Sequence, residues 1–267
     1  MGFALDEETV LTAHGDGRYS RPITDIFWNM ESAFGGWALA LAVEAVTLEA
    51  QPNATLASIN AIFLAAIKGE TVFVCVDVLS QRKRTGFFRV HLHQDAADGP
   101  LLFSADIVMS ERVETDIDFK PLMPDIKPAE EVTPLAFPPG MGPRWFSHYD
   151  QRIADGAPFT AQEIPRSAVW IRESDARPLD IKGLVTISDV PMPRTFFLGN
   201  APRFSSTVSY SFSLFATEEE LAEIGDSPIL VESDSDRVRN GMSDQQARIW
   251  SPNGTLIALT NQIAFFR

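Results

Sequence analysis

Three polar residues in the second half of the chain lie where an apolar pattern is interrupted, and their types suit chemistry with water. Asp189 lies in VTISDVPMPRTFF, where Pro191 and Pro193 prevent a regular helix from continuing. Thr207 lies in FSSTVSYSFSLF, and Gln262 lies in the closing segment GTLIALTNQIAFFR. A carboxylate among apolar side chains can act as a general base, while hydroxyl and amide groups orient a water by hydrogen bonds.

Each of the three residues also has an ordinary structural interpretation. An aspartate at such a break commonly accepts hydrogen bonds from the backbone of a turn. Alternation places Thr207 among serines on one strand face, and such a face is usually the solvated side of an antiparallel sheet. Gln262 shares a face of the last strand with Ala258 and Ala264, whereas Asn261 lies on the other. A buried amide needs a hydrogen-bond partner, structural or ligand, so the residues alone leave both interpretations open.

The other reactive side chains give weaker signals. His91 and His93 share a face of a predicted strand, which would supply half of a metal site, but no third ligand is near them in the sequence. Cys75 stands alone, so neither a disulfide nor a thiolate metal site is expected. The Gly35-Gly36 pair is too short to indicate a phosphate loop. Without a G-x-S-x-G elbow, Walker loop or dinucleotide fingerprint, we expect no cofactor.

Composition excludes several classes of partner. The 267 residues carry a formal net charge of -14, which argues against nucleic acid, and the basic stretch QRKRTG from Gln81 is best explained as a solvated turn. The longest apolar run, from Trp37 to Val43, is too short to span a bilayer. The N-terminal MGFALDEETV is acidic where an export signal would be basic and apolar. We therefore expect a cytoplasmic protein with no membrane partner.

Two tandem units are predicted on either side of a linker. Residues 112 to 143 are rich in proline and acid and lack a sustained period. Each half has short strand-like segments, one helix-like segment, at residues 34 to 50 and at about 178 to 197, and then four strand-like runs. The first helix is apolar nearly all round, as expected for a helix wrapped by a sheet. We expect an α+β fold with domains at 1–115 and 144–267, joined by the linker 116–143, each a curved antiparallel sheet around a central helix.

The order of these features resembles that of the type II (TesB-like) acyl-CoA thioesterases, which have a double hotdog fold. FGGW opens the first helix, and ISDVPMP, STVSYSFSL and LIALTNQ match the family segments that carry its Asp, Thr and Gln. The resemblance implies that Asp189, Thr207 and Gln262 hold the water that attacks an acyl-CoA thioester, in fatty acid metabolism. A backbone N–H at a helix start would suit the developing oxyanion, and Gly35, Gly36 and Val190 are the candidates.

Alternatives remain beside this assignment. Glu44 lies in the first helix, and in some single-hotdog thioesterases a glutamate in this helix acts as the base. A structural glutamate at a helix end or on the surface is the simpler explanation. A non-catalytic acyl-CoA-binding protein would keep the same fold. An enoyl-CoA hydratase of this fold has His five residues after its Asp, where this chain has Arg194. A homo-oligomer also stays open, because association hides the edges of such sheets.

Overall fold

The computed structural model describes residues 2–138 and 142–267. The helices are α1 (Ala4–Glu8), α2 (Gly35–Glu49), α3 (Ile181–Ile187), α4 (Thr195–Leu198) and α5 (Glu218–Ile224), with short 3-10 turns η1 (Ala129–Glu131) and η2 (Arg144–His148). The strands of the first half are β1 (Thr12–Gly15), β2 (Arg18–Pro22), β3 (Trp28–Asn29), β4 (Ser32–Ala33), β5 (Thr55–Phe63), β6 (Thr71–Gln81), β7 (Thr85–Gln94) and β8 (Leu101–Ser110). Those of the second half are β9 (Tyr149–Asp155), β10 (Ser167–Glu173), β11 (Ser205–Leu214), β12 (Ile229–Asp234), β13 (Val238–Arg239), β14 (Met242–Trp250) and β15 (Leu256–Phe266).

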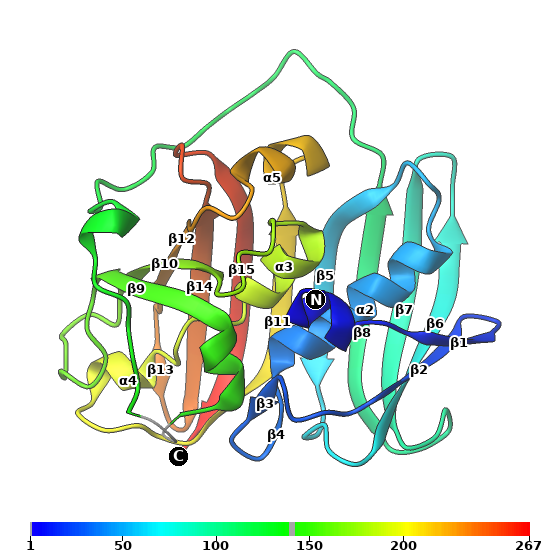
Figure 1. Cartoon of the computed structure of the whole chain (residues 1–267), viewed down its shortest axis with the longest axis horizontal. Coiled ribbons are helices and arrows are strands. Elements are labelled where there is room, and N and C mark those ends of the chain that lie inside the picture. Colours follow the sequence, from blue (N-terminus) through cyan, green and yellow to red (C-terminus); the bar gives the residue numbers. More distant parts are fainter. Residues whose placement is uncertain (1, 139–141) are drawn as a thin grey trace.

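One antiparallel sheet runs through both halves of the chain. Its order is β1-β2-β6-β7-β8-β5-β11-β15-β14-β12-β10-β9, with β13 paired to β14, and β3 and β4 form a separate pair. The halves meet at β5 and β11, where the register runs from Ser209 opposite Ile62 to Ser213 opposite Ser58. Figure 1 shows α2 against the first half of this sheet and α3 against the second. The predicted pair of sheet-and-helix units is therefore confirmed.

Helix α2 forms the core of the first half. Its side chains are buried without interruption from Trp37 to Val43, and Ala45 and Val46 are buried as well. Burial on every side matches the apolar pattern, because a helix enclosed by a sheet has no solvent face to populate with charge. Each buried leucine, such as Leu39 or Leu41, contributes about 1.5–3 kcal/mol relative to an exposed one.

The second helical segment differs from its prediction. A single helix over about 178 to 197 is wrong, since α3 ends at Ile187 and α4 begins only at Thr195. Asp180 caps α3, its Oδ1 accepting a 2.8 Å hydrogen bond from the Gly183 N–H. Pro191 lacks a backbone N–H and cannot extend the α3 hydrogen-bond ladder, so the chain leaves the helix at Asp189.

Part of the predicted linker packs against the second unit. Met123, Ile126 and Ala129 cover Trp170 and Trp250 on the outer face of the sheet. The Trp170 indole donates a 2.8 Å hydrogen bond to the Lys127 carbonyl. Side chains earlier in the linker stay exposed, among them Ile117, Phe119 and Leu122. Residues 139–141 of the predicted linker lie outside the described residues, and the division of the chain into domains stays a prediction.

An ion-pair network joins the N-terminal helix to the second half. The guanidinium of Arg177 is almost fully buried and contacts Asp6 at 2.8 Å and Glu173 at 3.3 Å. Lys182 contacts the same Asp6 at 3.3 Å and Glu44, on α2, at 3.2 Å. These contacts tie α1 and α2 to the segment that leads into α3.

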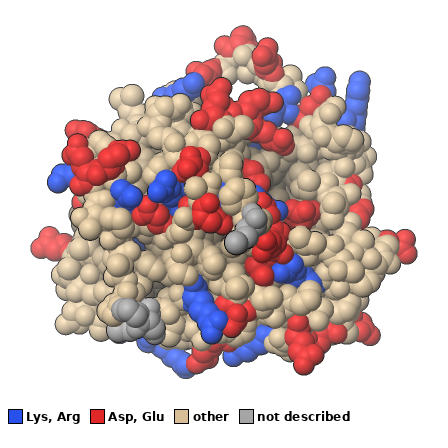
Figure 2. Space-filling view, in the orientation of Figure 1, with Lys and Arg blue, Asp and Glu red and all other residues tan. Residues whose placement is uncertain are grey.

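The QRKRTG stretch forms the turn between β6 and β7, as predicted. The Arg82 N–H donates to the Thr85 carbonyl at 2.9 Å, and Arg84 forms an exposed ion pair with Glu111. This turn lies beside the end of β8, at the end of the strands away from the start of α2 (Figure 1). On the face of the molecule in Figure 2, acidic and basic side chains are interspersed.

Candidate active site

Thr207 and Gln262 meet on the inner face of the second half of the sheet. The Thr207 hydroxyl donates a 2.8 Å hydrogen bond to Gln262 Oε1. A β-bulge at Val208 makes this contact possible, since Thr207 pairs with Ala264, whereas Ser209 already pairs with Ile263. The extra residue turns Thr207 onto the face of Gln262 and away from the serines that follow. The solvated-face interpretation of Thr207, based on strict alternation, is therefore wrong.

Gln262 is buried, with 5 % of its surface exposed, and its neighbour Asn261 is exposed. The predicted faces of β15 are thus confirmed: the small and polar residues Ala258, Thr260 and Gln262 face inward. Because Oε1 of Gln262 accepts from Thr207, its Nε2 is oriented as a donor on the opposite side of the amide. The threonine oxygen keeps lone pairs that can accept a further hydrogen bond.

Asp189 follows α3 in the chain, and in space its side chain lies against the start of α2. A Cβ built on Gly35 would approach Asp189 Oδ2 to 2.6 Å, so the carboxylate rests against the glycine backbone. Burial raises the pKa of Asp189 to about 7, and a hydrogen bond with the Gly36 backbone opposes that rise. A carboxyl with this pKa is poised to exchange protons near neutrality, as a general base requires.

The two glycines of FGGW permit this close approach. Gly35 has to stay without a side chain because Asp189 and the ring of Phe63 occupy the space. A Cβ on Gly36 would lie 2.7 Å from the Thr186 carbonyl of α3, so the second glycine lets the two helices pack together. Phe34, which precedes them, stacks on Trp145 of η2 at 4.5 Å between ring centroids. The glycine pair serves helix packing and the position of Asp189.

Tyr210 connects the two parts of the site. It is opposite Gln262 in the register of β11 and β15, so both side chains lie on the inner face. Its hydroxyl forms a 2.5 Å hydrogen bond with the hydroxyl of Ser188, the residue before Asp189. Burial and the negative charge of Asp189 raise the pKa of Tyr210. Among the described contacts, Asp189 has no direct hydrogen bond with Thr207 or Gln262.

The candidate oxyanion donors differ in their hydrogen bonding. The Val190 N–H already donates to the Ile187 carbonyl at 3.0 Å. Gly35 and Gly36 occupy the first turn of α2, whose N–H groups have no acceptor within the helix and carry the positive end of its dipole. The Gly36 N–H already donates to the Asp189 carboxylate, so Gly35 is better placed than Gly36 or Val190 to stabilise further negative charge beside Asp189, and all three assignments stay predictions.

Sequence patterns did not reveal two buried polar residues around this site. Gln245 of β14 is opposite Gln262 in the register, and its Oε1 accepts a 2.9 Å hydrogen bond from Nε of Arg194. In the sequence, Arg194 is distinguished only as a departure from the hydratase pattern. Alternation in β14, with Ser243, Gln245 and Ala247 on one face, was the available signal, but alternation does not tell which face is buried.

Other candidate residues lie elsewhere. The Glu44 carboxylate pairs with Lys182 and lies nine residues along α2 from Gly35, about 13 Å at the usual helical rise, so it is far from Asp189. The rings of His91 and His93 are 5.9 Å apart, and the described residues contain no group of three side chains suited to hold a metal. Cys75 is buried, and burial raises its pKa.

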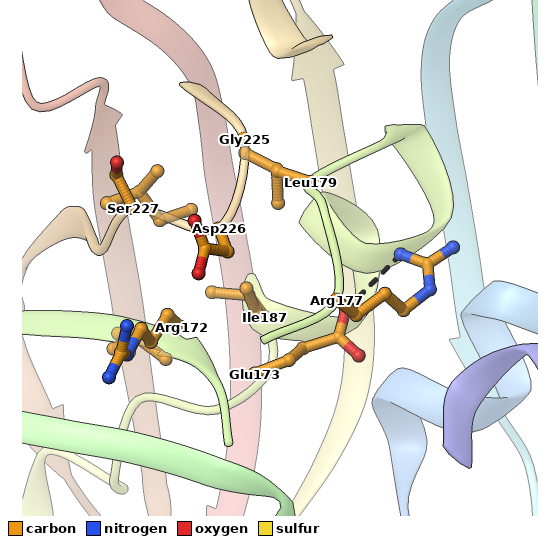
Figure 3. A pocket seen from close by; sticks show the side chains of 10 residues that line it. Arg172, Glu173, Arg177, Leu179, Ile187, Gly225, Asp226 and Ser227 are labelled. Atoms are coloured by element: carbon orange, nitrogen blue, oxygen red, sulfur yellow. Dashed lines mark hydrogen bonds and ion pairs between the residues drawn. The ribbon is translucent and has the colours of Figure 1, made fainter. Parts of the chain in front are cut away.

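A small pocket lies beside the end of α3, where Ile187 lines it (Figure 3). Glu173 and Arg177 line it on one side with their charged ends turned away from Asp226 and Ser227, which come from the loop before β12. Burial raises the pKa of Glu173 to about 8 even though Arg177 opposes the shift. None of the predicted catalytic residues lines this pocket, and two of its charged side chains, Glu173 and Arg177, belong to the ion-pair network around Arg177.

Family comparisons cover most of the chain. A family model described as "Acyl-CoA thioesterase C-terminal domain" matches residues 129–266, and one described as "Acyl-CoA thioesterase N-terminal domain" matches residues 24–110. The chain belongs to the acyl-CoA thioesterase family. A comparison with curated proteins gave no match. The resemblance to TesB-like thioesterases that the motif order indicated is thereby confirmed.

Solved structures show that this thioesterase family member has the hot dog fold. A conserved protein of unknown function with a hot dog fold from Alicyclobacillus acidocaldarius matches at a TM-score of 0.92 and 23% identity, covering 100% of this chain and 99% of that one. An acyl-CoA thioesterase II, TesB2, from Mycobacterium marinum matches at 0.77 and 18%, covering 99% and 98%. A putative thioesterase II from Thermobifida fusca YX matches at 0.86 and 15%, covering 99% and 98%. Within the described ranges, no helix combines the length and hydropathy needed to cross a membrane.

Proposed function

We propose that this chain hydrolyses an acyl-CoA thioester to a free acid and CoA, with Asp189, Thr207 and Gln262 acting on one water. The observation that carries the proposal is the Thr207 to Gln262 hydrogen bond on the inner face of the sheet. On a solvated strand face, water would satisfy both side chains, so this bond is expected of residues that face inward. The bond also fixes the donor and acceptor directions of both side chains. Membership of the acyl-CoA thioesterase family supports the substrate class.

The reaction needs a base, a held water and an anion site. Asp189, with a pKa of about 7, takes a proton from the water as the water oxygen attacks the thioester carbonyl. Gln262 Nε2 donates to that water, and the Thr207 oxygen accepts from it. The first-turn N–H of α2 at Gly35 stabilises the oxyanion of the tetrahedral intermediate, while the Gly36 N–H supports the Asp189 carboxylate. Collapse of the intermediate breaks the carbon–sulfur bond, and the proton held by Asp189 passes to the CoA thiolate, which leaves as the thiol, so no covalent enzyme intermediate is needed.

The decisive experiment is a thiol-release assay over short, long, branched and aromatic acyl-CoAs, with Asp189→Asn as the test variant. We expect the wild type to release thiol from at least one class and Asp189→Asn to lower turnover by about a hundredfold or more, the scale of a lost general base. Unchanged turnover in a folded Asp189→Asn variant would disprove the role of Asp189. Tight acyl-CoA binding by the wild type without thiol release would instead indicate the non-catalytic binding protein.

An enoyl-CoA hydratase is disfavoured by the surroundings of Arg194. That side chain is 1 % exposed and its donors are engaged by protein acceptors, so it does not stand in for a histidine base. We expect a flat absorbance trace when the protein is incubated with crotonyl-CoA. Membership of the acyl-CoA thioesterase family is consistent with work in the cytoplasm on acyl-CoA of fatty acid metabolism.

A further inference from the structure

Arg194 is a buried cation that is held almost entirely by neutral acceptors. It is 1 % exposed, and the described ion pairs within 4 Å include none with this guanidinium. Its nitrogens donate to Met192 O at 2.7 Å, Gln245 Oε1 and Ser167 Oγ at 2.9 Å, Pro165 O at 3.0 Å and Ser233 O at 3.3 Å, and it stacks on the ring of Phe197 at 4.3 Å. Burial lowers its pKa to about 9. Burying a charge costs free energy unless hydrogen bonds offset the cost, so these acceptors have to stay in position around Arg194.

These acceptors belong to two parts of the candidate site. Met192 lies three residues after Asp189, in the segment that the prolines force out of α3. Gln245 lies opposite Gln262 in the β14–β15 register, so their Cβ atoms are lateral neighbours on the inner face. Arg194 therefore connects the segment that carries Asp189 to the strand pair β14–β15 that carries Gln262.

The chemistry of the guanidinium makes the bridge directional. Arginine carries only donors in a planar fork, so the amide of Gln245 must present its oxygen to Nε, and its Nε2 then points away from Arg194. Tyr210 already holds Ser188 on the other side of Asp189. The segment 188–192 is thus attached at both ends to strands that carry or adjoin Gln262 and Thr207.

We propose that Arg194 is a positioning residue for thioester hydrolysis, holding the Asp189 segment at a fixed separation from the strand pair β14–β15 that carries Gln262. This inference rests on the proposed function, because it concerns the geometry of the same site. Arg194 touches neither water nor substrate and acts through Met192 and Gln245. Misplacement of a catalytic group by about 1 Å is enough to reduce a rate by about a hundredfold.

The kinetic test compares Arg194→Met and Gln245→Leu with a matched control, Arg112→Met. Arg112 likewise donates to two backbone carbonyls, Leu56 O at 2.9 Å and Leu214 O at 2.7 Å, but at the opposite end of β11 from Thr207. We expect Arg194→Met and Gln245→Leu to lower kcat at least tenfold with KM within twofold. Arg112→Met should keep kcat within twofold, with all rates measured where circular dichroism shows a folded protein.

Gln245→Leu and one further variant, Arg194→Lys, guard against trivial outcomes. Gln245→Leu leaves four of the five acceptors of Arg194 in place, so it keeps the test valid if Arg194→Met does not fold. Arg194→Lys keeps the charge but lacks the fork, and we expect it to restore only part of kcat. A folded Arg194→Met or Gln245→Leu protein with wild-type kcat would overturn the proposal.

A carboxyl ¹³C NMR titration of Asp189 tests the proposal independently of turnover. In the wild type we expect a midpoint of about 7. Removing a nearby positive charge alone would raise this pKa, whereas release of the segment into water would lower it toward the ordinary value. We expect Gln245→Leu and Arg194→Met to lower the midpoint by at least one pH unit. An unchanged or raised midpoint would refute positioning even if the wild type hydrolysed no acyl-CoA, so failure of the proposed function is recognised separately.

Discussion

At the scale of single residues, the proton affinity of Asp189 sets the behaviour of the candidate site. Its carboxylate is enclosed by the glycine backbone at the start of α2 and by Phe63, with one backbone hydrogen bond to support its charge. Desolvation outweighs that bond, so the acid is weaker than an exposed aspartate. The carboxyl is therefore half ionised near neutrality, where the proposed base would be most effective in proton transfer.

The pH dependence of turnover follows from this pKa. A general base works only when ionised, so kcat/KM should rise about tenfold per pH unit below pH 7 and level off above it. A rate profile from pH 5 to 9 on the best acyl-CoA of the panel measures the midpoint. In Asp189→Asn the residual rate should lose this inflection. A wild-type profile that is flat between pH 5.5 and 8 would contradict the assignment of Asp189 as base.

Gln262 and Asn261 offer a matched pair of amides in one strand. Gln262→Ala removes the acceptor of Thr207 and the proposed donor to water, so we expect turnover to fall about tenfold to a hundredfold. Asn261→Ala alters an exposed side chain on the other face and should leave kcat within twofold. Steady-state kinetics on both variants measures the difference. Equal effects of the two substitutions would show that the inner face of β15 has no special role.

At the scale of elements, two local irregularities assemble the site. The bulge at Val208 turns Thr207 inward, and the proline-enforced gap between α3 and α4 frees Asp189 from the helix. Both irregularities interrupt hydrogen-bond ladders where functional side chains have to be aimed, which is the common use of such features. Regular elements on either side keep the positions rigid.

The start of α2 makes a specific prediction about Gly35 and Gly36. In Gly35→Ala the new methyl would lie 2.6 Å from Asp189 Oδ2, so the carboxylate has to move and turnover should fall at least tenfold. In Gly36→Ala the methyl would meet the Thr186 carbonyl at 2.7 Å, and a backbone cannot yield as a side chain does. That variant should lose about 1–3 kcal/mol of unfolding free energy.

Kinetics and urea denaturation of both glycine variants separate the two effects. The expected pattern is a larger loss of kcat for Gly35→Ala and a larger loss of stability for Gly36→Ala. If Gly35→Ala retained full turnover, the placement of the Asp189 carboxylate against this glycine would be wrong.

At the scale of the whole molecule, the two halves are joined by β-sheet pairing and by buried charge. The pairing of β5 with β11 makes one sheet, and the network around Arg177 ties α1 to the segment before α3. The site depends on this union, because Gly35 and Gly36 come from the first half while Asp189, Thr207 and Gln262 come from the second.

Loss of Arg177 should therefore destabilise the whole chain. Burial keeps the Glu173 carboxyl largely protonated at pH 7, so Arg177→Met mainly loses the charge-assisted hydrogen bonds to Asp6 and Asp180. We expect the free energy of unfolding to fall by about 1.5–3 kcal/mol. Arg144→Ala removes an ion pair with Asp25 that is exposed on both sides, and should cost less than about 1 kcal/mol. Urea denaturation at pH 7 measures both. A loss below 1 kcal/mol for Arg177→Met would show that the network contributes little.

The sequence by itself determined the overall fold and the order of the candidate residues. Apolar residues all round α2 and alternation along the later strands are local patterns, and local patterns are sufficient to predict helices, strands and a helix wrapped by a sheet. The sequence also separated Gln262 from Asn261, because the two faces of a strand alternate without reference to the partner. The motif order then supplied the family.

Only the tertiary structure decided which of these residues meet and what state they adopt. Alternation alone put Thr207 on the wrong face, because a bulge is defined by pairing with a strand more than fifty residues away. The raised pKa of Asp189 and the engagement of Arg194 depend on burial by elements from distant parts of the chain. Desolvation and cross-strand register are properties of the assembled molecule, so no local pattern in the sequence records them.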